Sequence, residues 1–162
     1  MAGPLLGFLV TQTRNREDAE DLLGEVFLAA VKDIGRFSGD ASGFKAWLYR
    51  IATNRSIDLA RRRGRRPEHA LPEDLLDPDD LQEQVERAGR RTEVWRAVMA
   101  LPDEQRRVIA LRLTSDLPAA EIADLLGKTT GAVKALQHRA MANLAKALGS
   151  PYPDDAPERL DP

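Results

Sequence analysis

Residues 117–148 read LPAAEIADLLGKTTGAVKALQHRAMANLAKAL, and this stretch decides how the rest of the chain is interpreted. Gly127 suits the position just after a helix, and Thr129 is a good N-cap for a second one. Apolar residues repeat at helical spacing on both sides of this turn. They are Ala120, Ile122, Ala123, Leu125 and Leu126 before it, and Val133, Leu136, Ala140, Leu144 and Leu148 after it. The stretch is therefore predicted to be a helix-turn-helix.

The second helix of this motif carries basic and polar side chains beside its apolar stripe. In helix-turn-helix proteins the second helix lies in the major groove, where such side chains meet the edges of the bases. No acidic residue occurs between Leu125 and Pro153, which favours DNA binding over the alternative, a helical motif that never touches DNA. The candidate contacts of this half are Lys128, Thr129, Lys134, Gln137, His138 and Arg139.

The composition of the whole chain favours an all-α fold. Its 162 residues are 43% hydrophobic and 5% aromatic, and no run of β-branched or aromatic residues alternates with period two. The absence of cysteine excludes a disulfide framework, and two histidines far apart in sequence do not suggest a metal site. No stretch looks like a signal or membrane-spanning segment, so we expect a soluble cytoplasmic protein without cofactors.

The net charge of −2 argues against nucleic-acid binding, but the distribution of charge argues for it. Between Lys45 and Arg66 there are eight basic residues and one acid, whereas residues 67–86 hold eight acids and no Lys or Arg. Two basic segments separated by an acidic one suggest two nucleic-acid contacts on one chain. Charge patterning alone leaves open the alternative that neighbouring blocks merely neutralise each other.

The first half of the chain is predicted to contain three helices. A short apolar helix covers about residues 5–15, and a stronger one covers about residues 17–34 with one broad apolar stripe. The third helix begins near Ser42, a plausible N-cap, and is ended by Gly64 and Pro67. Its apolar stripe fails at Asn54 and Arg55, which predicts either a bend or a polar pocket there.

These patterns divide the chain into two small helical domains. Residues 1–66 form the first, and residues 67–82, with three prolines and many acids, form a flexible linker. Helical periodicity returns over residues 83–148, the second domain, and Pro102 suits the first turn of a helix within it. Residues 149–162 are rich in proline and acid, as expected of a disordered tail.

Three motifs resemble one known family. They read DAEDLLGEVFL at residues 18–28, FKAWLYRIATN at residues 44–54 just before the arginine cluster, and LPDEQRRV at residues 101–108 ahead of the helix-turn-helix. Together, and in this order, they closely resemble bacterial RNA polymerase sigma factors of the extracytoplasmic-function type. The resemblance covers about residues 5–148. It implies a non-enzymatic transcription initiation factor with a region 2 domain and a region 4 domain.

The resemblance assigns a polymerase contact to the second helix. In the family, the helix with this acidic and apolar pattern docks on the clamp helices of the largest polymerase subunit, and region 4 reaches the flap of the second-largest subunit. Carried over, the polymerase-binding candidates are Asp21, Leu22, Glu25 and Phe27. The alternative for Leu22 and Phe27 is a place in the hydrophobic core.

The resemblance also assigns DNA contacts to the third helix. Asn54 falls where the family holds a base flipped out of the non-template strand of the −10 element, and an amide offers a base both donors and an acceptor. The arginines around and after it are expected to contact phosphates, with a solvated helix end as the alternative. These candidates are Arg55, Arg61, Arg62, Arg63, Arg65 and Arg66.

The expected partners are core RNA polymerase, promoter DNA and, because it is common in the family, an anti-sigma factor. Family precedent places −35-element contacts on the second helix of the helix-turn-helix, with Arg139 as the first choice for a base contact. The competing hypothesis is a stand-alone helix-turn-helix regulator whose first domain serves dimerisation or effector binding, which leaves the arginine cluster and the break in the pattern at Asn54 unexplained. An enzyme acting on nucleic acid is not supported, because the sequence shows no metal-ligand set or phosphate-binding glycine loop.

Overall fold

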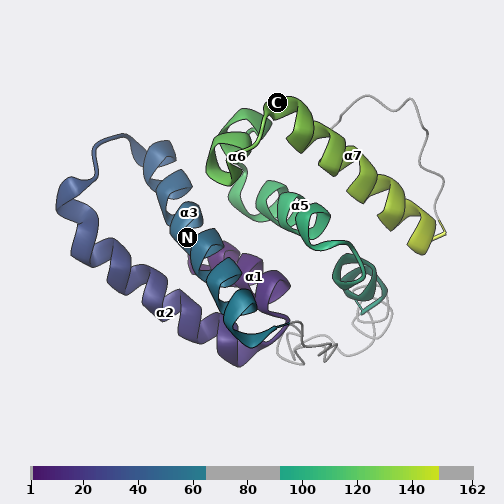
Figure 1. Cartoon of the computed structure of the whole chain (residues 1–162), viewed down its shortest axis with the longest axis horizontal. Coiled ribbons are helices and arrows are strands. Elements are labelled where there is room, and N and C mark those ends of the chain that lie inside the picture. Colours follow the sequence, from purple (N-terminus) through teal and green to yellow (C-terminus); the bar gives the residue numbers. More distant parts are fainter. Residues whose placement is uncertain (1, 65–91, 150–162) are drawn as a thin grey trace, which may run out of the picture.

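The computed structural model describes residues 2–64 and 92–149, and the secondary structure of these residues is entirely helical (Figure 1). The all-α prediction is confirmed for this part of the chain. The predicted linker at residues 67–82, most of the tail, and the candidates Arg65 and Arg66 lie outside the described residues. The helices are α1 (Ala2–Thr13), α2 (Arg16–Asp33), the 3-10 turn η1 (Ile34–Arg36), α3 (Ala41–Arg63), residues 92–99, α5 (Asp103–Ser115), α6 (Ala119–Leu126) and α7 (Thr130–Ala147).

Three helices begin at a side chain that caps the first turn. The carboxamide of Asn15 accepts from the Asp18 N–H at the start of α2, and the hydroxyl of Thr129 accepts from the Ala132 N–H at the start of α7. The cap of α3 is Asp40, which accepts from the Gly43 N–H at 2.8 Å. The expected cap at Ser42 is therefore wrong, because Ser42 lies inside the first turn that Asp40 closes.

The turn between α6 and α7 follows the sequence prediction. Gly127 ends α6 with φ at +65°, a left-handed conformation that costs glycine little and most other residues more. Its backbone N–H then faces the last carbonyls of α6, and the chain reaches the Thr129 cap two residues later. Helix, glycine turn and capped second helix together form the predicted helix-turn-helix.

Helix α1 lies at the centre of the described fold. Leu5, Phe8, Leu9 and Val10 are almost completely buried on it, and it contacts α2, α3 and α5. Buried side chains of the first region continue into those of α5 and α6 without a break, as one cluster. The two regions predicted from the sequence therefore pack against each other. We call their contact, made by α1 and α3 on one side and by residues 99–126 on the other, the seam.

Helix α3 is uninterrupted at the position where the apolar pattern fails. Its buried face continues past Ala52 through two small polar residues, Thr53 and Ser56, instead of through apolar ones. The Ser56 hydroxyl donates a hydrogen bond to the Thr53 carbonyl oxygen at 2.8 Å, so its burial costs little free energy. The phase shift in the sequence therefore marks a polar stretch of the core rather than a break in the helix, and it leaves Asn54 on the exposed side.

Candidate nucleic-acid interface

The outer face of α3 carries an amide followed by two arginines. Asn54, Arg61 and Arg62 are all exposed. Positions 54, 58, 61 and 62 recur at the spacing that brings residues to one face of a helix, so the amide and the guanidinium groups face the same side. This face combines one group suited to a base edge with charges suited to phosphates.

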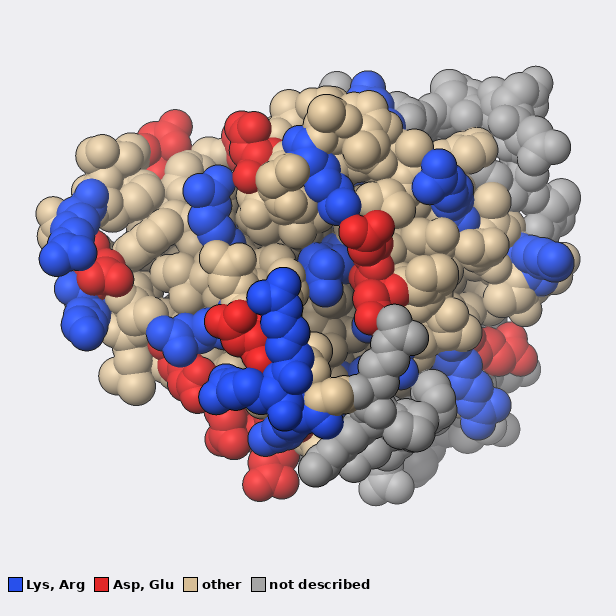
Figure 2. Space-filling model, in the orientation of Figure 1, with Lys and Arg blue, Asp and Glu red and all other residues tan. Residues whose placement is uncertain are grey.

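Two further arginines of α3 point towards α2 instead. Arg55 Nη1 lies 3.3 Å from Glu25 Oε2, and Arg63 forms an ion pair with Asp18. Both arginines remain partly exposed, so their guanidinium groups are engaged with acids but accessible. Figure 2 shows the result, basic and acidic side chains side by side where the C-terminal end of α3 meets α2. A phosphate at either arginine would compete with a carboxylate.

The second candidate surface lies on α7. Arg139 is exposed, and Lys134 and His138 are half-buried one turn apart. Gln137, by contrast, is only 4% exposed and faces the core together with Val133 and Ala140. It lies one turn after Val133 and three residues before Ala140, which puts it on the buried stripe. The expectation that Gln137 contacts DNA is therefore corrected, because its side chain does not reach the surface.

The turn before α7 places two more candidates. Lys128 Nζ lies 2.9 Å from Glu104 Oε1 on α5, and this hydrogen bond, reinforced by the charge of Lys128, lowers the pKa of the Glu104 carboxyl. The hydroxyl of Thr129 is already used as the cap of α7. Of these two, Lys128 is partly exposed and has the charge to meet a phosphate. Thr129 is exposed, but its hydroxyl serves mainly to start the helix.

The outer face of α2 holds a surface that the sequence did not single out. Leu28 and Val31 are 73% and 72% exposed, and Ile34 is 54% exposed at the end of the helix. The apolar stripe read from the sequence was broader than one packed face can bury, and that breadth was the signal. Single exposed apolar residues are common, but neighbours one turn apart form a patch.

The polymerase-binding candidates divide between this surface and the core. Asp21 is exposed, and Glu25 is exposed while paired with Arg55. Leu22 is 3% exposed and belongs to the core, which corrects its assignment as a contact. Phe27 is half-buried and packs against the same cluster. Leu22 and Phe27 therefore fix the position of α2, and Asp21 with Glu25 borders the patch.

Residues 2–64 and 92–149 hold neither a metal-ion site nor a membrane-spanning helix. No group of three or more His, Cys, Asp or Glu side chains there is placed to hold a metal ion. None of the helices in these ranges combines the length and the apolar character needed to cross a bilayer.

The fold and its two surfaces define a DNA-binding protein built around a helix-turn-helix. Comparison with protein families then identifies the family to which it belongs. The Sigma-70 region 2 family matches residues 2–66, and the Sigma-70, region 4 family matches residues 91–144. The chain belongs to the extracytoplasmic-function sigma factors of RNA polymerase, as the sequence motifs predicted.

Curated relatives support this placement. The chain is 38% identical to the sigma factor SigM of Mycobacterium tuberculosis, covering 85% of this chain and 67% of SigM. It is 33% identical to BldN of Streptomyces coelicolor, covering 92% of this chain and 56% of BldN, so it spans about half the length of that relative. The RNA polymerase sigma-H factor of Pseudomonas aeruginosa is 31% identical, and the match covers 89% of this chain and 80% of that factor.

A solved structure shares the fold. It is the sigma factor RpoE from Bartonella quintana, crystallised in complex with the anti-sigma factor NepR. The TM-score is 0.69 at 23% sequence identity, and the match covers 91% of each chain.

Proposed function

We propose that this chain directs core RNA polymerase to specific promoters and assists in melting them, as a sigma factor acting in the bacterial cytoplasm. The observation that carries the proposal is the presence, in one chain, of two exposed DNA-type surfaces in regions that match Sigma-70 regions 2 and 4. One surface is the Asn54, Arg61 and Arg62 face of α3, and the other is α7 with Arg139. Such a subunit binds and positions; it performs no catalysis.

The two surfaces are suited to different tasks. The exposed amide of Asn54 can donate to and accept from the edge of an unstacked base, and Arg61 and Arg62 can hold the backbone beside it. Unstacking one base costs a few kcal/mol, which binding of the exposed base and single strand offsets. Arg139 and Lys134 on α7 are placed for groove contacts in duplex DNA. We therefore assign promoter melting and the −10 element to α3 and the −35 element to α7.

We assign the polymerase contact to the patch of Leu28, Val31 and Ile34, bordered by Asp21 and Glu25. An exposed apolar patch with an acidic edge suits a protein partner better than DNA, whose phosphates repel carboxylates. The expected partner surface is on the clamp helices of the largest polymerase subunit, with region 4 contacting the flap of the second-largest subunit. An anti-sigma factor stays a prediction from the family resemblance.

The test of the DNA assignment is transcription in vitro with core polymerase over a genomic promoter library. Asn54→Ala should reduce strand opening, read by permanganate reactivity, by roughly tenfold, the size of a lost base contact of about 1–3 kcal/mol. Formation of the initial complex should change much less. Ser42→Ala, at an exposed position in the first turn of α3 and three turns away from Asn54, is the control and should leave opening intact. Equal loss of both steps in Asn54→Ala would contradict the assignment.

The test of the polymerase assignment is titration of core enzyme with the full chain. Leu28→Glu should weaken binding by roughly tenfold or more, because a buried leucine contributes about 1.5–3 kcal/mol at an interface. Ser42→Glu is the control, since it adds the same charge at an exposed position of α3, outside the α2 patch. If core enzyme retains neither the variant nor the wild-type chain, the sigma-factor proposal itself fails.

A further inference from the structure

A cavity lies beside the seam, between the end of α1, the last turns of α3 and the start of α5. Its volume is about 660 Å³. Ligand pockets in proteins usually measure about 300–1,000 Å³, so this cavity is large enough for a small molecule. None of the DNA and polymerase contacts assigned above uses it as a site.

The described walls of this cavity carry more positive than negative charge. Four arginines and two carboxylates line it, which leaves an excess of two positive charges. They are Arg14, Arg63, Arg106 and Arg107, with Asp18 and Asp103. Low-dielectric walls that carry one sign of charge focus the electric field in a cleft, so this cavity favours an anion.

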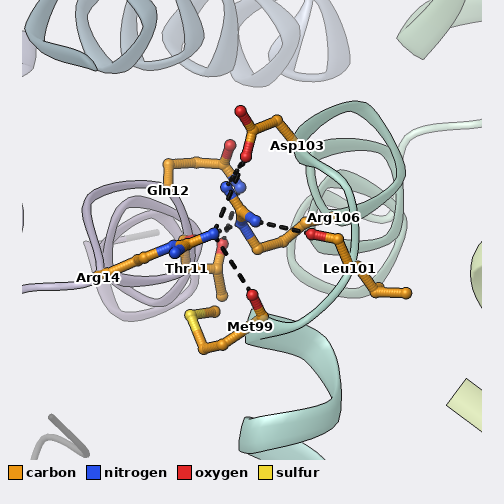
Figure 3. Close-up of polar contacts among 7 residues, drawn as sticks. All are labelled: Thr11, Gln12, Arg14, Met99, Leu101, Asp103 and Arg106. Atoms are coloured by element: carbon orange, nitrogen blue, oxygen red, sulfur yellow. Dashed lines mark hydrogen bonds and ion pairs between the residues drawn. The ribbon is translucent and has the colours of Figure 1, made fainter. Parts of the chain in front are cut away.

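Two of the arginines are held in place by contacts at the edge of the cavity. Arg106 is 4% exposed, and its Nε and Nη2 donate to Thr11 O at 3.0 Å and to Asp103 Oδ1 at 2.8 Å (Figure 3). Arg14 Nη2 donates to Met99 O at 3.4 Å and lies 3.9 Å from Asp103 Oδ1. These guanidinium groups are therefore positioned before any ligand arrives, which lowers the entropic cost of binding one.

Arg107 is the lining arginine that lacks a counter-charge of its own. It is half-buried, and within residues 2–64 and 92–149 its Nε is shielded from solvent without a hydrogen-bond partner. The lining carboxylates are engaged elsewhere, because Asp18 pairs with Arg63 and Asp103 accepts from Arg106. Burial lowers the pKa of the Arg107 guanidinium, although an arginine stays charged at neutral pH. A buried cation without a partner costs stability, and an anion in the cavity would compensate it.

The remaining wall indicates what else the ligand carries. Leu59, Met99 and Pro102 give the cavity apolar surface between its charged groups. A flat ring can pack on such surface, while guanidinium groups match phosphate oxygens with two parallel hydrogen bonds. Ligand pockets commonly combine apolar walls with a few converging polar groups in this way. The cavity therefore suits a molecule that has both a ring and phosphate groups.

We propose that this cavity binds a phosphate-bearing small molecule of nucleotide size, with Arg107 as the main counter-charge to its phosphates. A DNA duplex is too wide to enter a cavity of this volume, so the ligand class differs from that of the two DNA surfaces. The site would make the chain responsive to a small molecule. It does not depend on the DNA and polymerase assignments.

The test is isothermal titration calorimetry of the full chain at constant ionic strength, with ATP, GTP and inorganic phosphate as separate probes. At least one nucleotide should bind saturably, with one molecule per chain. Its affinity should exceed that of inorganic phosphate by roughly tenfold or more, because the ring and the further phosphates add contacts. Absence of saturable binding by both nucleotides, or equal affinity for nucleotide and phosphate, would overturn the proposal.

Arg107→Gln separates a ligand contact from a structural role. Affinity for the nucleotide should fall roughly tenfold or more, the size of a lost charge-assisted contact. Without ligand, the thermal midpoint should stay the same or rise, because the variant removes a charge that is buried without a partner. A fall in the thermal midpoint would instead assign Arg107 to the fold and contradict the proposal.

The control for this variant is Arg36→Gln, which removes the same charge at an exposed position of η1. Arg36 follows the end of α2, whereas the cavity is lined by Asp18 near its start. The control should bind the nucleotide as the wild type does. Equal loss of affinity in both variants would show general attraction to a positive surface and would contradict a site.

Ala60→Glu tests the location from the other wall without touching Arg107. Ala60 is an exposed residue of α3 that lines the cavity, and glutamate is a good helix former, so α3 should persist. The new carboxylate should lower nucleotide affinity by roughly tenfold, because it repels phosphate and competes for the arginines. Ala60→Gln, which has the same size and no charge, is the matched control. Equal affinity in the two Ala60 variants would place the ligand outside this cavity.

Discussion

Helices α3 and α7 carry the two candidate DNA surfaces, but they hold their positive charge in opposite ways. On α3, Arg55 and Arg63 are paired with Glu25 and Asp18 of the neighbouring α2. Helix α7 contains no acidic residue along its whole length, and its exposed Arg139 projects from a face without a carboxylate of its own. Helix α3 thus uses two of its arginines to hold two helices together, whereas Arg139 of α7 is not used in this way.

This difference teaches that basic residues in a DNA-binding region are not equivalent. An arginine already paired with an acid gains little from a phosphate, because one charge-assisted contact replaces another. An arginine without such a partner gains the full free energy of a new phosphate contact. We therefore expect DNA affinity to depend on Arg61 and Arg62 more than on Arg55 and Arg63 in the first region, and on Arg139 in the second.

Among the variants that test this difference between α3 and α7, Arg139→Ala is expected to have the largest effect. If Arg139 contacts a base edge, the variant should lose about 1–3 kcal/mol on the preferred −35 sequence and relax discrimination there. If Arg62 on α3 contacts a phosphate, as we propose, Arg62→Ala should instead weaken all sequences alike and lower the slope of log affinity against log salt by about 1. Binding of holoenzyme to a panel of promoter variants at several salt concentrations measures both. An equal loss of affinity for every promoter variant in Arg139→Ala would remove the distinction between the two helices.

A smaller effect is expected from releasing one of the paired arginines. Asp18→Asn removes one partner of Arg63 and should cost at most about 1 kcal/mol of stability, as usual for an exposed ion pair. The slope of log promoter affinity against log salt concentration should become steeper by about 1, because Arg63 can then meet a phosphate. Glu17→Gln, an acid in the same first turn of α2, is the control for the helix dipole. An unchanged slope in Asp18→Asn would show that Arg63 lies away from the DNA.

The smallest effect concerns the ion pair of Lys128 in the second region. The pKa of Glu104 is lowered in the folded chain by its hydrogen bond to Lys128, so the pair stabilises the fold above the ordinary carboxyl pKa. That contribution is lost as the pH falls through the lowered pKa, below about pH 4. The difference in thermal midpoint between the wild type and Glu104→Gln should therefore shrink on acidification. The stability that the pair contributes is about 0–1 kcal/mol, as for other exposed ion pairs. A constant difference down to pH 3 would contradict the pairing.

Much of the fold followed from the sequence because local signals were strong. Gly127 and Thr129 fixed the turn of the helix-turn-helix, and apolar spacing located the long helices. The errors were local too. Ser42 is as good a cap in isolation as Asp40, and only the path of the chain decides between them. The seam had no local signal at all, since an apolar residue such as Phe8 does not reveal which helix will cover it.

The candidate site was predictable in residue type but not in exposure. The failure of the apolar pattern at Asn54 predicted a bend or a polar pocket, but α3 continues without a break, because Thr53 and Ser56 carry the core past that point. The role of Asn54 in binding a base stays a prediction. Gln137 was expected beside the apolar stripe of α7, yet it lies on that stripe, one turn after Val133. Its spacing from Val133 and Ala140 was the signal for burial, and the polar residue type masked it.

The central place of α1 has a consequence for synthesis on the ribosome. Its buried residues are covered partly by α2 and α3 and partly by α5, which lies nearly a hundred residues later. At roughly 5–20 residues per second, α5 is translated several seconds after α1. During that interval the nascent chain exposes an apolar strip that the finished protein conceals. The emerging polypeptide is therefore a substrate for chaperones at a moment when the completed one is not.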